Sequence, residues 1–332
     1  MSEQERLLEY YPRFDERIID RVAEVAYRQR GTSWEKIRRG LPDTKVFSTG
    51  NFAIELMDII SANGYDETWV YHCPMGNPLT DRMQLRIATL AAAQPDKRIV
   101  GIGNPSGPRQ GVGKLPSSTL HAVWSGDLRP TIDPAMRYLS AQNIDKATHI
   151  GFSYGAEKAA AAAQYADRYD QAVPHGLFME PVALKERGLL ELGRDFNSTA
   201  TALDGYVNAA ANPAGVEASE RAAEKSRGMF GYILGLLRLS NIAIAHALTE
   251  DGFESRATEA LVKQEQMKTH LVWGTESELA LHALMTKVTK RLTDRFGLDR
   301  VSSMKMEGQK HAMGDDLFLH TTIVLQSLIS AV

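Results

Sequence analysis

Short apolar runs alternate with segments of helical period along most of the chain. The apolar runs, bounded by Gly, Pro or polar residues, predict buried strands at 45–48, 68–72, 98–102, 148–152, 175–181, 268–273 and 301–306. Apolar residues at helical spacing predict helices at 52–63, 83–94, 133–142, 157–169, 280–296 and 315–331. Strands that alternate with helices favour a mostly parallel sheet with helices on both faces, so the expected fold class is α/β.

Two segments depart from this alternation. Residues 1–40 are charged and have helical spacing, which predicts a helical N-terminal extension that packs on the body or serves as a partner-binding arm. From 183 to 266 strand signals vanish and helical ones dominate, with breaks near Gly205 and Asn212-Pro213. We therefore expect an inserted helical cap at 183–266 and a core formed by 41–182 and 267–332. The apolar stretch 230–248 approaches the length of a membrane span, but Arg238 at its middle favours a lid helix over an apolar pocket.

The sequence around Ser153 has the pattern Gly-x-Ser-x-Gly, from Gly151 to Gly155, between a predicted strand and an Ala-rich helix. In so tight a turn the residues two before and two after the serine crowd each other, so both have a steric reason to be glycine. The turn would lift the Ser153 hydroxyl clear of the sheet. The backbone N–H of Tyr154 would then lie at a helix N-terminus, where developing negative charge is stabilised. The pattern thus predicts a nucleophilic serine.

The loop at 73–78, after the predicted strand 68–72, is a candidate for a second backbone donor. Acyl transfer uses two such donors, and one commonly comes from the loop after an early central strand. Gly76 would let the backbone approach a substrate oxygen, and the N–H of Met75 or of Asn77 would be the donor. The two prolines of this loop have no N–H and are excluded.

Several chemically active residues follow directly after predicted strands. In open parallel sheets the site forms at the carboxyl ends of the strands, so residues in these positions converge. The residues in question are Ser153, Glu180, Glu276, Glu278 and His311, together with the loop at 75–77.

These features resemble the α/β-hydrolase superfamily over about residues 65–332, with a cap where that family often inserts one. The order of nucleophile, acid and histidine along the chain is also similar. The resemblance implies a serine hydrolase with Ser153 as nucleophile and His311 as general base. It also implies that the N–H of Tyr154 forms part of the oxyanion hole, with Met75 or Asn77 completing it.

The sequence leaves open which acid would orient His311. In most relatives an Asp stands three residues after the glycine that ends the next-to-last strand, and here that position is Ser277, flanked by Glu276 and Glu278. Some relatives instead carry the acid after the strand that follows the nucleophile, where this chain has Glu180. Glu180 and Glu276 are therefore nearly equal candidates, with Glu278 behind them. The surroundings of Glu180 are similar to the haloalkane dehalogenase pattern, but that family has an Asp nucleophile, so Ser153 argues against dehalogenation.

Composition narrows the class of protein further. The 332 residues carry a net charge of -3, from 38 basic and 41 acidic residues, which indicates neither nucleic acid nor an anionic membrane as a partner. Cys73 is the single cysteine, which excludes an internal disulfide, and the N-terminus lacks the apolar core of a signal peptide. We therefore expect a cytoplasmic protein whose partner is a small-molecule substrate, while a homo-oligomer stays open. No metal-ligand spacing of His or Cys is present, and no cofactor is implied.

The function that these residues predict is that of a carboxylic ester hydrolase acting on a small, partly apolar ester. A carbon–carbon bond hydrolase, a thioesterase or a cofactor-free peroxidase would use the same three residues. A protein of the same fold that only binds a ligand or a protein is the alternative from a different class. The turn at 151–155, called the nucleophile elbow in this superfamily, often has a histidine directly before the serine, and here that residue is Phe152. Phe152 and Ser277 both favour this alternative slightly.

Overall fold

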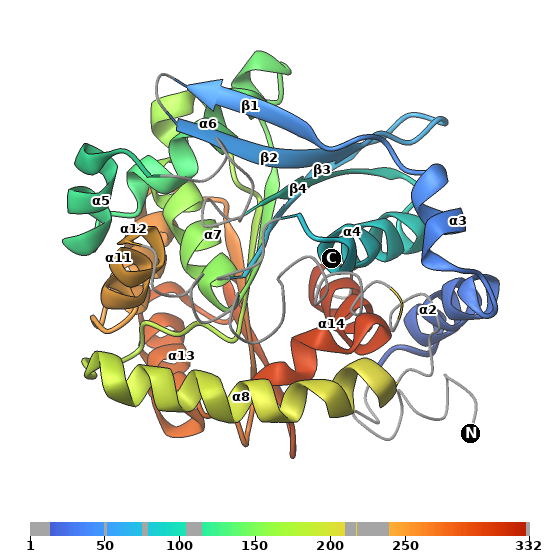
Figure 1. The fold of residues 1–332 in the computed structure, drawn as a ribbon. Helices are drawn as coiled ribbons and strands as arrows, with labels where there is room; N and C mark the ends of the chain where they lie inside the picture. The colour runs from blue at the N-terminus through green and yellow to red at the C-terminus, as the bar shows by residue number, and fades with distance from the viewer. Residues whose placement is uncertain are drawn as a thin grey trace.

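The computed structural model describes residues 14–49, 52–74, 79–103, 115–209, 217 and 239–329. Within them an eight-stranded sheet has the order β1-β2-β4-β3-β5-β6-β7-β8 (Figure 1). Its strands are β1 (Lys45–Thr49), β2 (Phe52–Ile59), β3 (Glu67–His72), β4 (Lys97–Ile102), β5 (Thr148–Phe152), β6 (His175–Met179), β7 (Lys268–Gly274) and β8 (Val301–Met306). β1 pairs antiparallel with β2, and β2 with β4, whereas the remaining neighbours are parallel.

Helices cover both faces of the sheet (Figure 1). One face carries α2 (Glu16–Gln29), α3 (Trp34–Arg39), α4 (Asp81–Ala93) and α14 (Leu317–Ile329). The other carries α6 (Arg129–Ala141), α7 (Tyr154–Tyr165), α12 (Phe253–Lys263) and α13 (His282–Phe296). The remaining described helices are α5 (Ser117–Trp124), α8 (Leu189–Ala209) and α11 (Leu239–Ala247), with the short 3₁₀ helices η1 (Ala166–Tyr169) and η2 (His311–Asp315).

Each face of the sheet has its own apolar core, because successive side chains of a strand point to opposite faces. In β6, Leu177 and Met179 belong to the core under α4 and α14, while Phe178 belongs to the core under α7. All three are at most 1% exposed, which is the burial expected for a strand at the centre of a parallel sheet.

The parallel register places the carboxyl ends of the central strands at one edge. Phe152 of β5 pairs with Met179 of β6, and Met179 pairs with Val272 of β7. Residues that follow these strands therefore meet at this edge, as the sequence predicts for Ser153 and Glu180.

The helix predicted at 52–63 is wrong, because 52–59 forms strand β2. The polar residues of this segment fit helical spacing, but one of them, Asp58, is buried as the partner of Arg98 on the neighbouring strand β4, 2.6 Å away. Burial raises the pKa of Asp58, but hydrogen bonds from Arg98 and from the Tyr138 hydroxyl outweigh that and hold it below its usual value. A contact made by residues forty positions apart cannot be read from local periodicity.

The break predicted near Gly205 is also wrong. Helix α8 continues through it from Leu189 to Ala209, since a single interior glycine weakens a helix by only about 1 kcal/mol. The other expected break, Asn212-Pro213, and most of 230–248 lie outside the described residues. The described parts of 183–266 contain helices and no strand, and the cap at 183–266 stays a prediction.

The described part of the N-terminal extension lies on the body of the protein. Helix α2 packs against α14 and α4 (Figure 1), and the N–H of Asp15 donates to Gln326 Oε1 at 2.7 Å. Trp34, at the start of α3, is fully buried, and its backbone N–H donates to Glu217 Oε2 at 2.8 Å. No helix among the described residues is both long and apolar enough to cross a membrane.

Candidate active site

Ser153 stands in a strained turn between β5 and α7. Its backbone has φ 57° and ψ −129°, a conformation that residues other than glycine rarely adopt. A Cβ on Gly151 would lie 2.0 Å from the carbonyl oxygen of Gly155, and one on Gly155 would lie 2.0 Å from the carbonyl oxygen of His72. Backbone atoms cannot approach a Cβ so closely, so both glycines are required for the steric reason expected from the sequence.

A chain of hydrogen bonds joins Ser153, His311 and Glu180. The Nε2 atom of His311 lies 3.0 Å from Ser153 Oγ, and its Nδ1 atom lies 2.7 Å from Glu180 Oε2. The three residues are separated by up to 158 positions in the sequence, and each is at most 3% exposed. In this buried setting charges are weakly screened, so each of these contacts is stronger than it would be in water.

Glu180 accepts hydrogen bonds from several directions. The N–H of Gly274 donates to Oε1 at 2.5 Å, and the hydroxyl of Ser277 donates to Oε2 at 2.5 Å. An acceptor-only partner requires His311 to carry its proton on Nδ1, which leaves Nε2 free to accept the proton of Ser153. Glu180 also has a left-handed backbone, φ 55°, so two of the three residues in this chain of hydrogen bonds hold strained conformations, which cluster at functional sites.

The other candidate carboxylates lie elsewhere. Glu276 is exposed, and its backbone N–H donates to the carbonyl of Gln309 at 2.9 Å. Glu278 accepts a hydrogen bond from Ser198 of α8 at 3.1 Å and lies 3.8 Å from Lys310 Nζ. The structure therefore brings Glu180 to His311 and leaves Glu276, its nearly equal rival in the sequence, in solvent.

The expected oxyanion donors are described only in part. Tyr154 is the first residue of α7, so helical geometry gives its backbone N–H no partner within the helix. Met75 and Asn77 lie outside the described residues. The loop that would hold them starts from β3, the immediate neighbour of β5 in the sheet.

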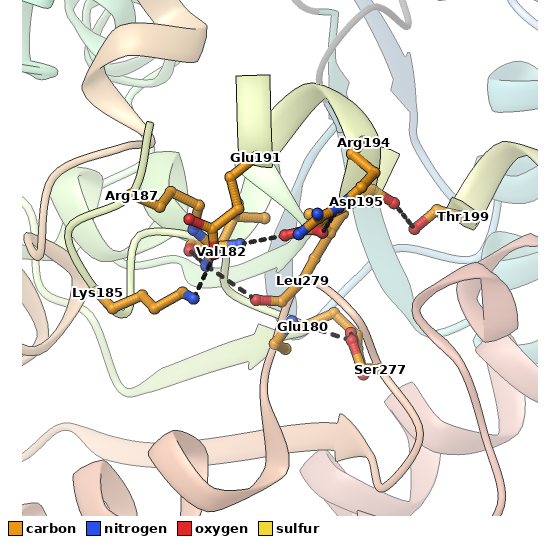
Figure 2. A network of polar contacts seen from close by, with 11 residues as sticks. Glu180, Val182, Lys185, Arg187, Glu191, Arg194, Asp195, Thr199, Ser277 and Leu279 are labelled. Carbon is orange, nitrogen blue, oxygen red and sulfur yellow. Dashed lines mark hydrogen bonds and ion pairs between the residues drawn. The ribbon is translucent and has the colours of Figure 1, made fainter. Parts of the chain in front are cut away.

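Arg187 connects the elements that carry Glu180 and Ser277 (Figure 2). Its guanidinium donates to the carbonyl of Val182, after β6, at 2.9 Å and to that of Leu279, after β7, at 3.2 Å. It also lies 3.3 Å from Asp195 of helix α8. Burial lowers the pKa of Arg187, and Asp195 offsets part of that effect. The buried guanidinium of Arg187 thus connects the loop after β6, the loop after β7 and helix α8.

The turn that begins at His311 is held by a second set of contacts. Asp315, at the end of η2, pairs with Arg86 at 2.8 Å and with Arg82 at 2.5 Å, both on α4. The ring of Phe152 stacks on the His311 imidazole with ring centroids 5.2 Å apart. A Cβ on Gly314 would lie 2.4 Å from that ring, so a glycine is needed for the turn to approach Phe152.

Three buried basic residues, Lys158, His72 and His149, lie behind the turn at Ser153. Lys158 of α7 is 1% exposed, its Nζ has no hydrogen-bond partner, and burial lowers its pKa to about 8. His72 and His149 contact each other at 3.0 Å on neighbouring strands. Burial lowers the pKa of His149 to about 4 and that of His72 well below its usual value. These rings are therefore neutral at pH 7, whereas Lys158, with a pKa of about 8, is mostly charged.

Sequence reasoning missed Arg187 and Asp315 and treated Ser277 only as a departure from the family pattern. Each of them acts through a contact to a distant element, and a surface residue of the same type would carry the same local signal. Among the described residues no cluster of His, Cys, Asp and Glu has the arrangement of a metal site.

No family model matches this chain, and no curated protein matches it. Solved structures do. The Pyrococcus furiosus esterase Pf2001 matches with a TM-score of 0.54 and 10% identity, over 88% of this chain and 91% of that one. The enol-lactonase from Burkholderia xenovorans LB400 matches with a TM-score of 0.53 and 12% identity, over 86% and 100%. The thioesterase domain from the curacin biosynthetic pathway matches with a TM-score of 0.50 and 18% identity, over 87% and 99%.

The chain therefore has the α/β-hydrolase fold, as its strand order, its central parallel strands and these similarities all indicate. The resemblance expected from the sequence is confirmed at the level of fold. Activity and substrate do not follow from similarity at such low identity and depend on the site itself.

Proposed function

We propose that this protein is a serine hydrolase that cleaves carboxylic esters through Ser153, His311 and Glu180. The observation that carries the proposal is the buried chain of hydrogen bonds that joins these three side chains, with the serine at the tip of a strained turn. A serine hydroxyl, an imidazole and a carboxylate in this order are the parts that nucleophilic acyl transfer requires.

In the proposed reaction, His311 Nε2 takes the proton of Ser153 as Oγ attacks the ester carbonyl. Glu180 stabilises the imidazolium that forms, because its Oε2 accepts the proton on Nδ1. The N–H of Tyr154 holds the oxyanion together with a second amide from the 75–77 loop, each worth about 3–4 kcal/mol of the barrier. His311 then protonates the leaving alcohol and activates a water that releases the acid product.

The proposed substrate is a small ester with an apolar acyl or alkyl group. Residues 230–248 are mostly apolar and are predicted to form a lid over the site, which supports an apolar substrate group. The burial of Ser153, which is 3% exposed, supports it as well. Three similar structures have the names of an esterase, a lactonase and a thioesterase. These names favour cleavage at an acyl carbon over carbon–carbon or peroxide chemistry.

A fluorophosphonate probe with mass spectrometry, together with p-nitrophenyl acetate and butyrate hydrolysis, tests the proposal. We expect one adduct, on Ser153, and hydrolysis that vanishes in Ser153→Ala and His311→Gln. Glu180→Gln should lower the rate by about 10³–10⁴, as loss of the orienting carboxylate does in serine proteases. Glu276→Gln is the matched carboxylate control and should hydrolyse at the wild-type rate. A folded wild type that neither labels nor hydrolyses would support the ligand-binding alternative.

A further inference from the structure

Ser277 occupies an unusual place beside the proposed triad. Its Oγ lies 2.5 Å from the same Glu180 oxygen that lies 2.7 Å from His311 Nδ1. A single carboxylate oxygen therefore separates the serine from the imidazole. Ser277 is 5% exposed, so water does not readily replace its hydroxyl as a partner of Glu180.

The direction of the Ser277 hydroxyl is fixed. The N–H of Ala280 donates to Ser277 Oγ at 3.0 Å, which occupies a lone pair of that oxygen. The hydroxyl proton is then available for Glu180, which as a carboxylate can only accept. Ser277 thus accepts a hydrogen bond from the backbone N–H of Ala280 and donates one to the Glu180 oxygen that faces His311.

The loop that carries Ser277 is also held in place from both sides. A Cβ on Gly274 would lie 2.1 Å from the carbonyl oxygen of Gln309, two residues before His311, and the N–H of Glu276 donates to that same oxygen at 2.9 Å. Arg187 holds the far end of the loop through the carbonyl of Leu279 (Figure 2). The backbone that carries the Ser277 hydroxyl therefore contacts the loop before His311 on one side and Arg187 on the other.

From these contacts we propose that Ser277 is a positioning residue that orients the Glu180 carboxylate. The inference rests on the proposed triad. A glutamate side chain has more freely rotating bonds than an aspartate and needs more restraint to present one oxygen to an imidazole. Gly274 restrains Oε1 and Ser277 restrains Oε2, so the plane of the carboxylate is fixed at both ends.

The experiment removes and restores the hydroxyl. Ser277→Ala should lower both kcat on p-nitrophenyl butyrate and the rate of fluorophosphonate labelling by about tenfold, the effect of one lost hydrogen bond to a charged group. KM should stay the same, because Ser277 acts through Glu180 and does not reach the substrate. Ser277→Thr keeps the hydroxyl and should label within about threefold of the wild type. Ser140→Ala, which removes a hydroxyl from α6 that bonds its own helix at 3.2 Å, is the matched control.

Each result has a definite meaning. A wild-type rate in Ser277→Ala, an equal loss in the Ala and Thr variants, or a change in KM alone overturns the inference. Persistent labelling or hydrolysis in Ser153→Ala instead overturns the proposed function. The two failures are distinguishable because the Ser153 variant contains an intact Ser277.

Discussion

Lys158 provides a measurable consequence of the core behind the elbow. Its ammonium is buried under Tyr154, 5.5 Å from the ring centroid, with no hydrogen-bond partner. Burial lowers its pKa from 10.5 to about 8. Each unit of pKa corresponds to about 1.4 kcal/mol, so the charged lysine lowers the free energy of unfolding by about 3 kcal/mol at pH 7.

The sign of the pH dependence follows from this shift. Between pH 8 and 10.5 the unfolded chain keeps the Lys158 proton while the folded protein has lost it, so the contribution to stability rises with pH. Replacing Lys158 with methionine, which is apolar and of similar length, removes the charge. Lys158→Met should therefore be more stable than the wild type by about 3 kcal/mol at pH 7, and most of this difference should vanish by about pH 10.

Urea unfolding at pH 7, 8, 9 and 10, followed by circular dichroism, measures this difference. Lys290→Met is the control, because that lysine is 73% exposed and its replacement should change stability by less than about 0.5 kcal/mol at every pH. Burial raises the pKa of Cys73 from 9.0 to about 11, so this thiol also changes stability near pH 9 and 10, but it is present in both proteins. A less stable Lys158→Met at pH 7, or a gain in stability that does not change with pH, would refute the reasoning.

Two further predictions concern the same region. Gly155→Ala places a Cβ 2.0 Å from the carbonyl oxygen of His72. This variant should therefore lose at least about 2 kcal/mol of stability and most labelling of Ser153. Gly188→Ala is the control and should lose neither, because its Cβ would have nothing within 4 Å. Because burial lowers the pKa of His149 from 6.5 to about 4, the unfolded chain takes up its proton first as the pH falls. The wild type should therefore lose about 3 kcal/mol between pH 6.5 and 4 from this group, and His149→Phe should show a shallower loss in acid unfolding; equal slopes for the two proteins would argue against a neutral buried ring.

Local sterics explain why the elbow could be found without a structure. The requirement for glycine at 151 and 155 arises within five residues of chain. The alternation of strands and helices similarly depends on local periodicity, and it predicted the central parallel strands, the helices on both faces and hence the edge where Ser153, Glu180 and His311 meet. Periodicity failed at β2, whose burial depends on β1, β4 and the distant Arg98.

The choice among the acids was made by the tertiary structure. Glu180 and Glu276 each follow a strand and are of the same residue type, so nothing in their local sequence separates them. The fold turns Glu180 inward, where Gly274, Ser277 and His311 donate to it, and leaves Glu276 in solvent. A triad is a set of distances between separate loops, and the packing of the strands and helices that carry those loops sets these distances. The sequence by itself predicted the glycine-flanked turn at Ser153 and the architecture, while packing decided which carboxylate lies against His311 and the contacts that hold that carboxylate in place.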